Sequence, residues 1–349
     1  MKRPMLAASA LLLALFLVSG CGSVAPLAQQ APALVFPTAT GGTGQTPTSG
    51  TKAGTTLLTY RGHTDWVTAV AWSPDGREIA TGSNDATVQI WDASTGTQIV
   101  KFNRQAQVTS LAWSPDGKQL LVGGLDGLAV IIDASSGQVV VYLQGHTGEV
   151  NAVAWSPDGT RIATASSDQT VVVWDVNPLQ KVATFQAAGQ LHAVAWSPDS
   201  KRVAAGGNDE LVHIWDVASG QEVFTYHGAQ GIVLAVAWSP DGTHIASGAE
   251  TAIQIWDATT GSAIQTYHGH TGTINALAWS PDGERIASVS SASGGETDPN
   301  PAQEWNAVTG ARIVSYQGHG NNLLCVAWSP DGTRIVTGGW DRTAQVWQA

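Results

Sequence analysis

The sequence is poor in charge and in cysteine. Charged residues make up 12% of its 349 residues, about half of the usual fraction. Acidic residues outnumber basic ones, 27 to 16, so the formal net charge is −11 at pH 7. This excess of negative charge disfavours non-specific binding to nucleic acid or to anionic lipid headgroups. With only Cys21 and Cys325 present, we expect no disulfide framework.

The sequence also lacks the local motifs of common catalytic and metal sites. It contains no G-x-S-x-G turn, no His-Glu-x-x-His motif, no cysteine pair with zinc spacing and no phosphate-binding glycine loop. Its nine histidines are scattered along the chain. We therefore expect no enzymatic activity, no metal and no cofactor.

Residues 1–20 have the features of an export signal. Lys2 and Arg3 form a basic segment, and the apolar residues 5–18 are too few for a comfortable membrane-spanning helix. The run Val18-Ser19-Gly20-Cys21 resembles the lipobox of bacterial lipoproteins. This resemblance implies cleavage before Cys21, a diacylglycerol on its sulfur and anchoring to a bacterial membrane outside the cytoplasm. The alternative is an ordinary secretory signal followed by an incidental cysteine.

Residues 21–55 would then comprise the lipidated Cys21 and a tether. Residues 22–55 are rich in Ala, Gly, Thr, Pro and Gln and contain one charged residue, Lys52. Such a composition cannot form a core and is typical of flexible linkers. We expect it to hold residues 56–349 near the membrane while leaving them free to reorient.

The rest of the chain is a tandem repeat. Seven copies of Ala-Trp-Ser-Pro-Asp place tryptophans at positions 72, 113, 155, 196, 238, 279 and 328, separated by 41, 42, 41, 42, 41 and 49 residues. A period of about 40 to 45 residues is typical of arrays of four-stranded units. One such unit cannot bury its own apolar face, so the units must pack together in a ring or a stack.

The third copy illustrates the unit. Residues 138–143, 150–155, 161–166 and 170–174 are short β-branched or alternating runs, and tight-turn residues separate them. In the turn Ser156-Pro157-Asp158-Gly159, proline fixes φ at the second position and glycine accepts a positive φ. The unit therefore reads as an antiparallel meander of four strands.

Two dipeptides recur at fixed places in these units. Gly-His lies near the start of four copies, at 62–63, 145–146, 269–270 and 318–319, and Trp-Asp ends four copies, at 91–92, 174–175, 215–216 and 256–257. This pattern resembles the WD-repeat β-propeller family over residues 56–349. The resemblance implies an all-β fold with seven blades of four antiparallel strands. Ile132-Asp133, Trp305-Asn306 and Trp347-Gln348 depart from the pattern, and the second, fourth and fifth copies lack the histidine.

The ends of the repeat array predict a closed ring. The chain stops after the third strand of the last copy, while a spare strand, Thr56 to Tyr60, precedes the first Gly-His. If this strand completes the last blade, every blade has four strands and two exposed sheet edges disappear.

The resemblance also implies a hydrogen-bonded tetrad of His, Ser or Thr, Asp and Trp within a blade. The first copy offers His63, Asp85 and Trp91 with Thr81 or Ser83, and the third offers His146, Asp168 and Trp174 with Thr164 or Ser166. Such sets look superficially like a Ser-His-Asp triad. Since catalysis needs one site and the set recurs, we expect it to satisfy buried polar groups instead.

In WD-repeat proteins, partners commonly contact the narrow top face around the central channel. The positions that map to this face are Trp66, Thr68, Asn84, Leu125, Glu149, Asn151, His192, Ile232, Leu234, Leu324 and Trp340. Trp66 and Trp340 are the two tryptophans outside the repeat framework, and ring closure makes their copies neighbours. We predict a contact patch of Trp66, Trp340 and Leu324, because clustered exposed aromatic residues are typical of interaction hot spots. Alternatively, both rings fold over local backbone.

The sequence therefore favours a membrane-anchored, extracytoplasmic scaffold that binds other proteins or peptides and no nucleic acid. One alternative is a propeller lipoprotein of an outer-membrane assembly machinery, although its repeats are of a different type. Another is a sugar-binding or enzymatic propeller with a site in the central channel. The insertion at residues 290–302 is expected to form a longer loop, which is either tolerated or functional.

Overall fold

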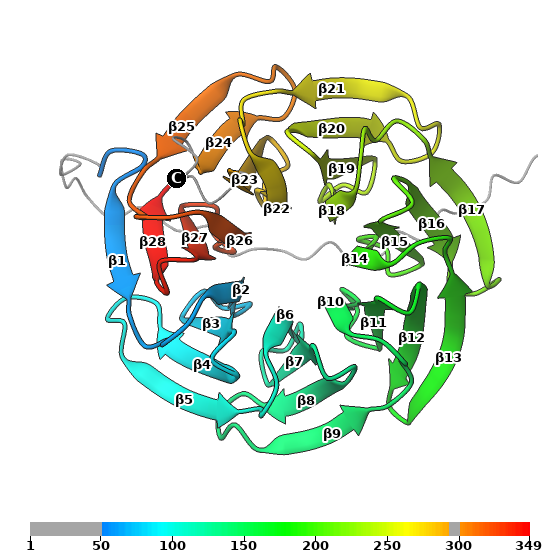
Figure 1. Cartoon of the computed structure of the whole chain (residues 1–349), viewed down its shortest axis with the longest axis horizontal. Coiled ribbons are helices and arrows are strands. Elements are labelled where there is room, and N and C mark those ends of the chain that lie inside the picture. Colours follow the sequence, from blue (N-terminus) through cyan, green and yellow to red (C-terminus); the bar gives the residue numbers. More distant parts are fainter. Residues whose placement is uncertain (1–50, 293–300) are drawn as a thin grey trace, which may run out of the picture. The chain divides into compact units, whose positions relative to one another are not determined.

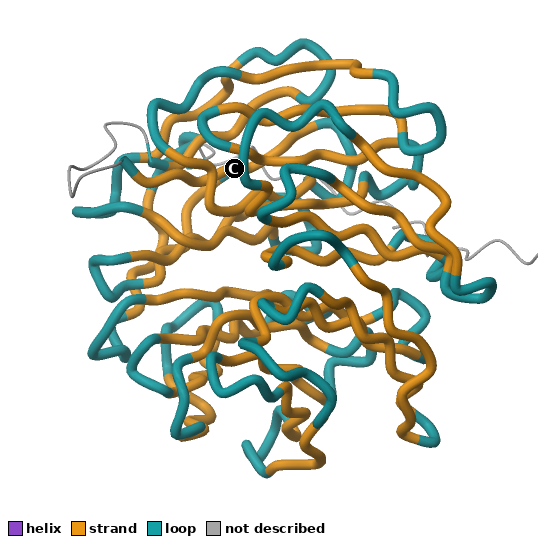
Figure 2. Tube along the Cα trace, turned by 45° about the vertical axis from the view of Figure 1, so that its right-hand side comes forward, coloured by secondary structure: helices purple, strands orange, loops and turns teal. Residues whose placement is uncertain are grey.

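The computed structural model describes residues 51–292 and 301–349. Over these residues, 28 strands form seven four-stranded antiparallel sheets around a central axis (Figure 1). Only strands and loops are present in this part of the chain (Figure 2), and no helix there is long and apolar enough to cross a membrane. The expectation of a seven-bladed all-β propeller is confirmed.

We number the blades by their inner strands, in chain order. Blade 1 contains β2 (Val67–Trp72), β3 (Glu78–Ser83), β4 (Thr87–Asp92) and β5 (Gln98–Asn103); blade 2 contains β6 (Val108–Trp113), β7 (Gln119–Gly124), β8 (Ala129–Asp133) and β9 (Val139–Leu143); blade 3 contains β10 (Val150–Trp155), β11 (Arg161–Ser166), β12 (Thr170–Val176) and β13 (Leu179–Gln186). Blade 4 contains β14 (Leu191–Trp196), β15 (Arg202–Gly207), β16 (Val212–Asp216) and β17 (Gln221–Tyr226); blade 5 contains β18 (Val233–Trp238), β19 (His244–Ala249), β20 (Ala252–Asp257) and β21 (Ala263–Tyr267); blade 6 contains β22 (Thr273–Trp279), β23 (Arg285–Ser291), β24 (Ala302–Asn306) and β25 (Arg312–Tyr316). Blade 7 contains β26 (Leu323–Trp328), β27 (Arg334–Gly339), β28 (Ala344–Gln348) and β1 (Thr56–Tyr60).

The Trp-Ser-Pro-Asp-Gly segments form the turns between the first and second strands. In blade 1, the Ser73 hydroxyl donates to Asp75 at 2.7 Å and accepts from the Glu78 amide at 2.9 Å. Gly76 closes the turn with a φ of 70°, a value that costs other residues more than glycine. These local bonds start the second strand at a fixed distance from the inner one.

The core lies between neighbouring blades. Val67 and Trp72 of blade 1, for example, pack in one buried cluster with Cys325 and Val336 of blade 7. Cys325 fills a place held by alanine in other repeats, as its sequence position suggests, and burial raises the pKa of its thiol. Each blade thus covers the apolar face of the next, which a single repeat cannot do alone.

The N-terminal strand closes the ring as predicted. β1 pairs antiparallel with β28, with Tyr60 opposite Ala344, and the two strands lie side by side in Figure 1. The Tyr60 ring stacks on Trp91 of blade 1 with a centroid separation of 4.6 Å, and its hydroxyl donates to Gln89 at 2.6 Å. One strand therefore completes blade 7 and also packs against blade 1.

The N-terminal segment and the insertion in the sixth copy are only partly within the residues that the structure describes. The signal segment, Cys21 and the tether up to residue 50 lie outside them. Within the remainder of the tether, Gly54 donates to the Gln348 carbonyl at 2.7 Å, and Thr55 accepts from the Gln348 amide at 2.9 Å. The insertion at 290–302 lies between β23 and β24, and its residues 293–300 are also outside the described residues.

Candidate partner-binding face

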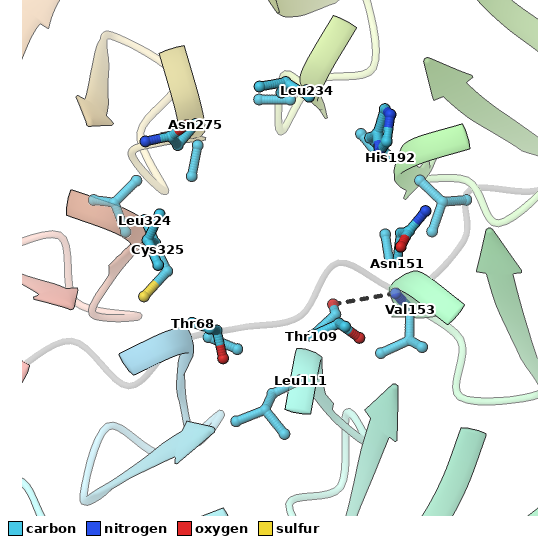
Figure 3. Close-up of a pocket in the computed structure, with 18 of the residues that line it drawn as sticks. Thr68, Thr109, Leu111, Asn151, Val153, His192, Leu234, Asn275, Leu324 and Cys325 are labelled. Carbon is cyan, nitrogen blue, oxygen red and sulfur yellow. Dashed lines mark hydrogen bonds between the residues drawn. The ribbon is translucent and has the colours of Figure 1, made fainter. Parts of the chain in front are cut away.

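The mouth of the central channel opens where the seven inner strands begin. A hollow of about 290 Å³ there is lined by seven of the positions predicted for the top face, together with Val108, Thr109 and Asn275. The seven are Thr68, Asn84, Leu125, Asn151, His192, Leu234 and Leu324. Figure 3 shows Asn151, His192, Leu234 and Leu324 around the opening, each contributed by a different blade.

Several polar side chains of this wall are engaged in holding the blades together. Thr68 donates to the Val108 carbonyl at 2.6 Å, and Thr109 donates to the Val150 carbonyl at 2.5 Å. Asn151 and Asn275 donate in the same way to the first inner-strand residue of the following blade, at 2.8 Å and 2.6 Å. Some of the polar groups predicted to contact a partner therefore form hydrogen bonds between neighbouring blades instead.

Blades 4, 5 and 7 carry different side chains at this position. His192 pairs with the Asn208 amide oxygen at 2.6 Å, while Leu234 and Leu324 present apolar groups. The channel mouth is consequently uneven, with one sector rich in amide and hydroxyl groups and two leucines elsewhere on its rim. Neither Glu149 nor Ile232 lines the hollow; Glu149 accepts from Ser167 at 3.4 Å, and Ile232 is 40% exposed.

Trp66 and Trp340 meet at the seam between blades 1 and 7. Their rings are stacked, with centroids 4.6 Å apart and planes 12° from parallel. Trp66 remains 38% exposed, whereas the buried indole nitrogen of Trp340 has no hydrogen-bond partner. The two predicted residues thus pack on each other at this seam, and their contact with a partner stays a prediction. Leu324 lies on the inner strand of the same blade 7 and lines the channel mouth.

Below this face, the tetrad residues are hydrogen-bonded within their blades. In blade 1, His63 pairs with Asp85 at 3.0 Å and with Thr81 at 2.8 Å, and the Trp91 indole donates to Thr81 at 3.3 Å. In blade 3, His146, Asp168, Thr164 and Trp174 repeat this arrangement at 3.0, 2.7 and 3.3 Å. The hydroxyls are those of Thr81 and Thr164, both fully buried. This burial and the paired polar atoms fit the expectation that the sets satisfy buried polar groups.

Two blades that lack the Gly-His histidine use another basic side chain to contact the turn aspartate. In blade 2, the Arg104 guanidinium bonds to Asp126 at 2.7 Å and to the Val122 carbonyl at 3.1 Å. In blade 4, His213 on β16 lies between Asp209 and Glu222, at 3.0 Å and 2.6 Å. Sequence reasoning missed both because it sought the histidine at its usual position.

The histidines of the Gly-His dipeptides and the aspartates bonded to them make the stability of the ring depend on pH. Asp341 bonds to His319 in blade 7 at 2.8 Å, as Asp168 bonds to His146 in blade 3. Burial alone raises the pKa of Asp168 and Asp341, but hydrogen bonds from threonine and histidine outweigh it and lower both pKa values to about 2. Burial lowers the pKa of His63, despite the neighbouring Asp85. A lowered folded-state pKa contributes stability above the unfolded-state pKa and loses it as pH falls.

We therefore expect the unfolding midpoint in urea to fall in two stages on acidification. The first stage begins below about pH 6.5, as His63 must bind a proton that the folded state disfavours. The second and larger stage lies between about pH 4 and pH 2, where the aspartates are protonated. Urea titrations at half-unit intervals from pH 8 to pH 2.5 measure this. An unchanged midpoint down to pH 3 would contradict the role given to the aspartates.

Comparison with known proteins agrees with this geometry. The family described as "WD domain, G-beta repeat" matches residues 54–92, 137–175, 179–216, 220–257, 261–294 and 310–348, which together exceed half of the chain. This chain belongs to the WD-repeat family. The unmatched stretch 93–136 contains most of blade 2, where Arg104 and Ile132 replace the usual His and Trp. Residues 98–147 instead match the anaphase-promoting complex subunit 4 WD40 domain.

Individual WD-repeat relatives match over a single repeat. A "Ribosome biogenesis protein BOP1 homolog" from Drosophila virilis is 54% identical over 39 residues, which are 11% of this chain and 5% of that protein. "Protein Mut11" from Chlamydomonas reinhardtii is 55% identical over 38 residues, or 11% of this chain and 10% of that protein. The matched segment thus spans a tenth or less of the curated relatives. Similarity of this extent concerns the framework of a blade.

The structure contains few other candidates for a chemical site in this WD-repeat ring. Within residues 51–292 and 301–349, no group of three His, Cys, Asp or Glu side chains is arranged to hold a metal ion. The predicted lipidation residue, Cys21, lies outside these residues. The candidate partner-binding site on the top face has two components, the stacked tryptophans and the channel mouth.

Proposed function

We propose that this WD-repeat propeller is a non-enzymatic scaffold that binds a protein or peptide on its top face. The observation that carries the proposal is the Trp66–Trp340 stack, which presents a partly exposed aromatic surface at the seam between blades 7 and 1. Aromatic residues in partly desolvated positions dominate the binding energy of many protein interfaces. Leu125 and Ile232, each 40% exposed, add apolar surface at other top-face positions.

Replacing both Trp66 and Trp340 with alanine tests this proposal. We expect capture of cross-linked partners from the native membrane fraction to fall at least about tenfold, since interface tryptophans commonly contribute about 2 kcal/mol or more each. Tyr142 on the outer strand β9 is 52% exposed, so Tyr142→Ala is a matched control that should capture partners normally. If the double variant keeps its melting temperature and captures the same proteins at the same yield, the top face is not the binding surface.

We further propose that the ring is held at a bacterial membrane, outside the cytoplasm, by a lipid on Cys21. The support is the basic, apolar and small-residue order of residues 1–21. A Cys21→Ser variant is expected to lose incorporation of labelled palmitate and to move from the membrane pellet to the soluble fraction. A variant that still sediments with membranes and still incorporates label would contradict the anchor.

A further inference from the structure

Three of the seams between blades are closed by an arginine stacked on a tryptophan. The guanidinium carbon of Arg202 lies 4.7 Å from the ring centroid of Trp238, and those of Arg285 and Arg334 lie 4.6 Å from Trp328 and Trp72. In each case the arginine begins the second strand of one blade and the tryptophan ends the inner strand of the next. These contacts lie at the opposite ends of the inner strands from the top face.

The seam arginines also find oxygen acceptors. Arg285 donates to the Gly332 carbonyl at 3.0 Å and to Asp282 at 3.2 Å, and Arg334 donates to the Gly76 carbonyl at 3.4 Å. Gly332 and Gly76 belong to the tight turn of the following blade. The blade 6/7 seam therefore offers Arg285 an indole face, a turn carbonyl and a carboxylate, and the blade 7/1 seam offers Arg334 an indole face and a turn carbonyl.

The seam between blades 5 and 6 keeps these acceptors but lacks the arginine. His244 begins β19 where Arg202, Arg285 and Arg334 begin the second strands of their blades, and its ring is bonded to the Thr243 hydroxyl at 2.7 Å. Trp279 is partly exposed here, whereas the tryptophans that end the other six inner strands are 6–9% exposed.

A cavity of about 620 Å³ opens at this seam. Its polar lining includes Asp241, His244, Asp282 and Gly283, and Trp279 forms part of its wall. Gly283 holds the turn position of Gly332 and Gly76, and Asp241 holds the position that Asp282 has at the next seam. Hydrogen bonds from Ser239 and the Thr243 amide lower the pKa of Asp241, so this carboxylate is ionised at neutral pH.

The rest of the cavity wall is apolar. Ile255 and Ile264 of blade 5 face Ala307 and Val308 of blade 6, and Val308 is 74% exposed. At other seams, a side chain from the outer strand fills the equivalent space against a glycine of the next blade, as Phe224 does at Gly261. Gln265 takes this position in blade 5, and a methylene stem could pack on the apolar wall beside it.

We propose that this cavity, the blade 5/6 pocket, binds an arginine side chain of a partner polypeptide. The guanidinium would stack on Trp279 and donate to the Gly283 carbonyl and to Asp241, as Arg285 does with Trp328, Gly332 and Asp282 at the next seam. Guanidinium groups stack on indole and pair with carboxylates more readily than ammonium groups do. The pocket lies at the opposite end of the inner strands from the channel mouth, so this proposal is independent of the top-face function.

The blade 2/3 seam shows that the absence of the arginine does not by itself make a seam suitable for binding a guanidinium. Gln119 stands at the arginine position there, but Trp155 is only 9% exposed and the cavity beside it contains Lys118. Both cavities contain two carboxylates, but an ammonium group repels a second cation, and the lining of the blade 5/6 pocket has no lysine or arginine. Since Asp282 is bonded to Arg285, Asp241 is the carboxylate that we assign to the ligand. The blade 2/3 seam therefore serves as a built-in comparison.

Titration with capped amino acids tests the proposal. N-acetyl-arginine amide should shift the indole resonance of Trp279 saturably in ¹H–¹⁵N spectra, assigned with a Trp279→Phe variant, and should bind with millimolar affinity. N-acetyl-citrulline amide has the same length without the charge and should bind at least about tenfold more weakly. Equal affinity for both compounds, or the absence of any saturable shift, would overturn the proposal. An affinity for free arginine equal to or above that of the capped form would overturn the assignment to a polypeptide.

Filling the pocket from within provides the matched variants. His244→Arg supplies the arginine seen at the other seams and should abolish binding while leaving the melting temperature unchanged or higher. Gln119→Arg adds the same charge at the equivalent position of blade 2 and should leave binding intact. Wild-type binding by His244→Arg, or an equal loss in Gln119→Arg, would overturn the proposal. The Trp66→Ala, Trp340→Ala variant should bind the probe normally, which separates this test from that of the top face.

Discussion

Deleting residues 1–60 is expected to lower the free energy of unfolding by at least about 4 kcal/mol. The deletion removes β1, and with it the ladder to β28 and the Tyr60 ring that stacks on Trp91. Tyr60 is 6% exposed, and loss of a buried aromatic side chain alone costs about 3–5 kcal/mol. The deletion also exposes β28 as a sheet edge, which favours aggregation. Urea unfolding followed by circular dichroism measures the change.

The control for this deletion begins at residue 51. It retains β1 together with Gly54 and Thr55, which bond to Gln348, and so separates loss of the strand from loss of the preceding segment. We expect the control to unfold cooperatively with seven intact blades. If both truncations unfold at the same urea concentration, the closing strand contributes little to stability, and the structural account of ring closure is wrong.

Replacing Asp126 with alanine should destabilise blade 2 more than replacing Arg104 with methionine. The Arg104 side chain is 3% exposed and that of Asp126 is 33% exposed. Asp126→Ala leaves a buried guanidinium without its counter-charge, which costs about 3–5 kcal/mol. Arg104→Met removes the buried charge, fills the same space with an apolar chain and leaves Asp126 able to contact water. We expect it to cost about 1 kcal/mol.

The informative result is which of the two variants loses more free energy of unfolding. Urea denaturation measures both values. The difference depends on burial of the cation, which is aided by Gly124. A Cβ atom at position 124 would lie 2.5 Å from the guanidinium carbon of Arg104, so glycine makes room where blades 1 and 3 carry Ser83 and Ser166. Equal losses, or a larger loss in Arg104→Met, would show that the pair is solvated in solution.

Much of the fold could be predicted because each repeat contains the residues that determine its own strands and turns. The Ser-Pro-Asp-Gly turns and alternating strands specify a blade, and the spare strand at Thr56 to Tyr60 specifies closure. The choice between Thr81 and Ser83 could not be made from the sequence, since it depends on register. Thr81 pairs with Gln89 on β4 and reaches the Trp91 indole, while Ser83 accepts from the Asp85 amide at 3.0 Å.

The candidate sites were only partly predictable, because they are built between blades. The prediction of ring closure already placed the copies that contain Trp66 and Trp340 side by side. The stacking of the two rings could not be predicted, because it depends on the conformations of the loops that contain them. The donation from Asn151 to the Leu191 carbonyl could not be anticipated, since these residues are 40 positions apart. The blade 5/6 pocket became apparent only when each seam could be compared with the others. Substitutions such as His244 for arginine are unremarkable in a single repeat.

The hydrogen bonds of Gln348 with Gly54 and Thr55 place the beginning and the end of the propeller side by side. A short peptide linker could join them, and new termini could then be cut into a surface turn of any other blade without altering the order of blades around the axis. Circular permutation of this kind would move the point at which the chain enters the disc. Its two faces could thus be turned towards or away from a supporting surface while every blade is preserved.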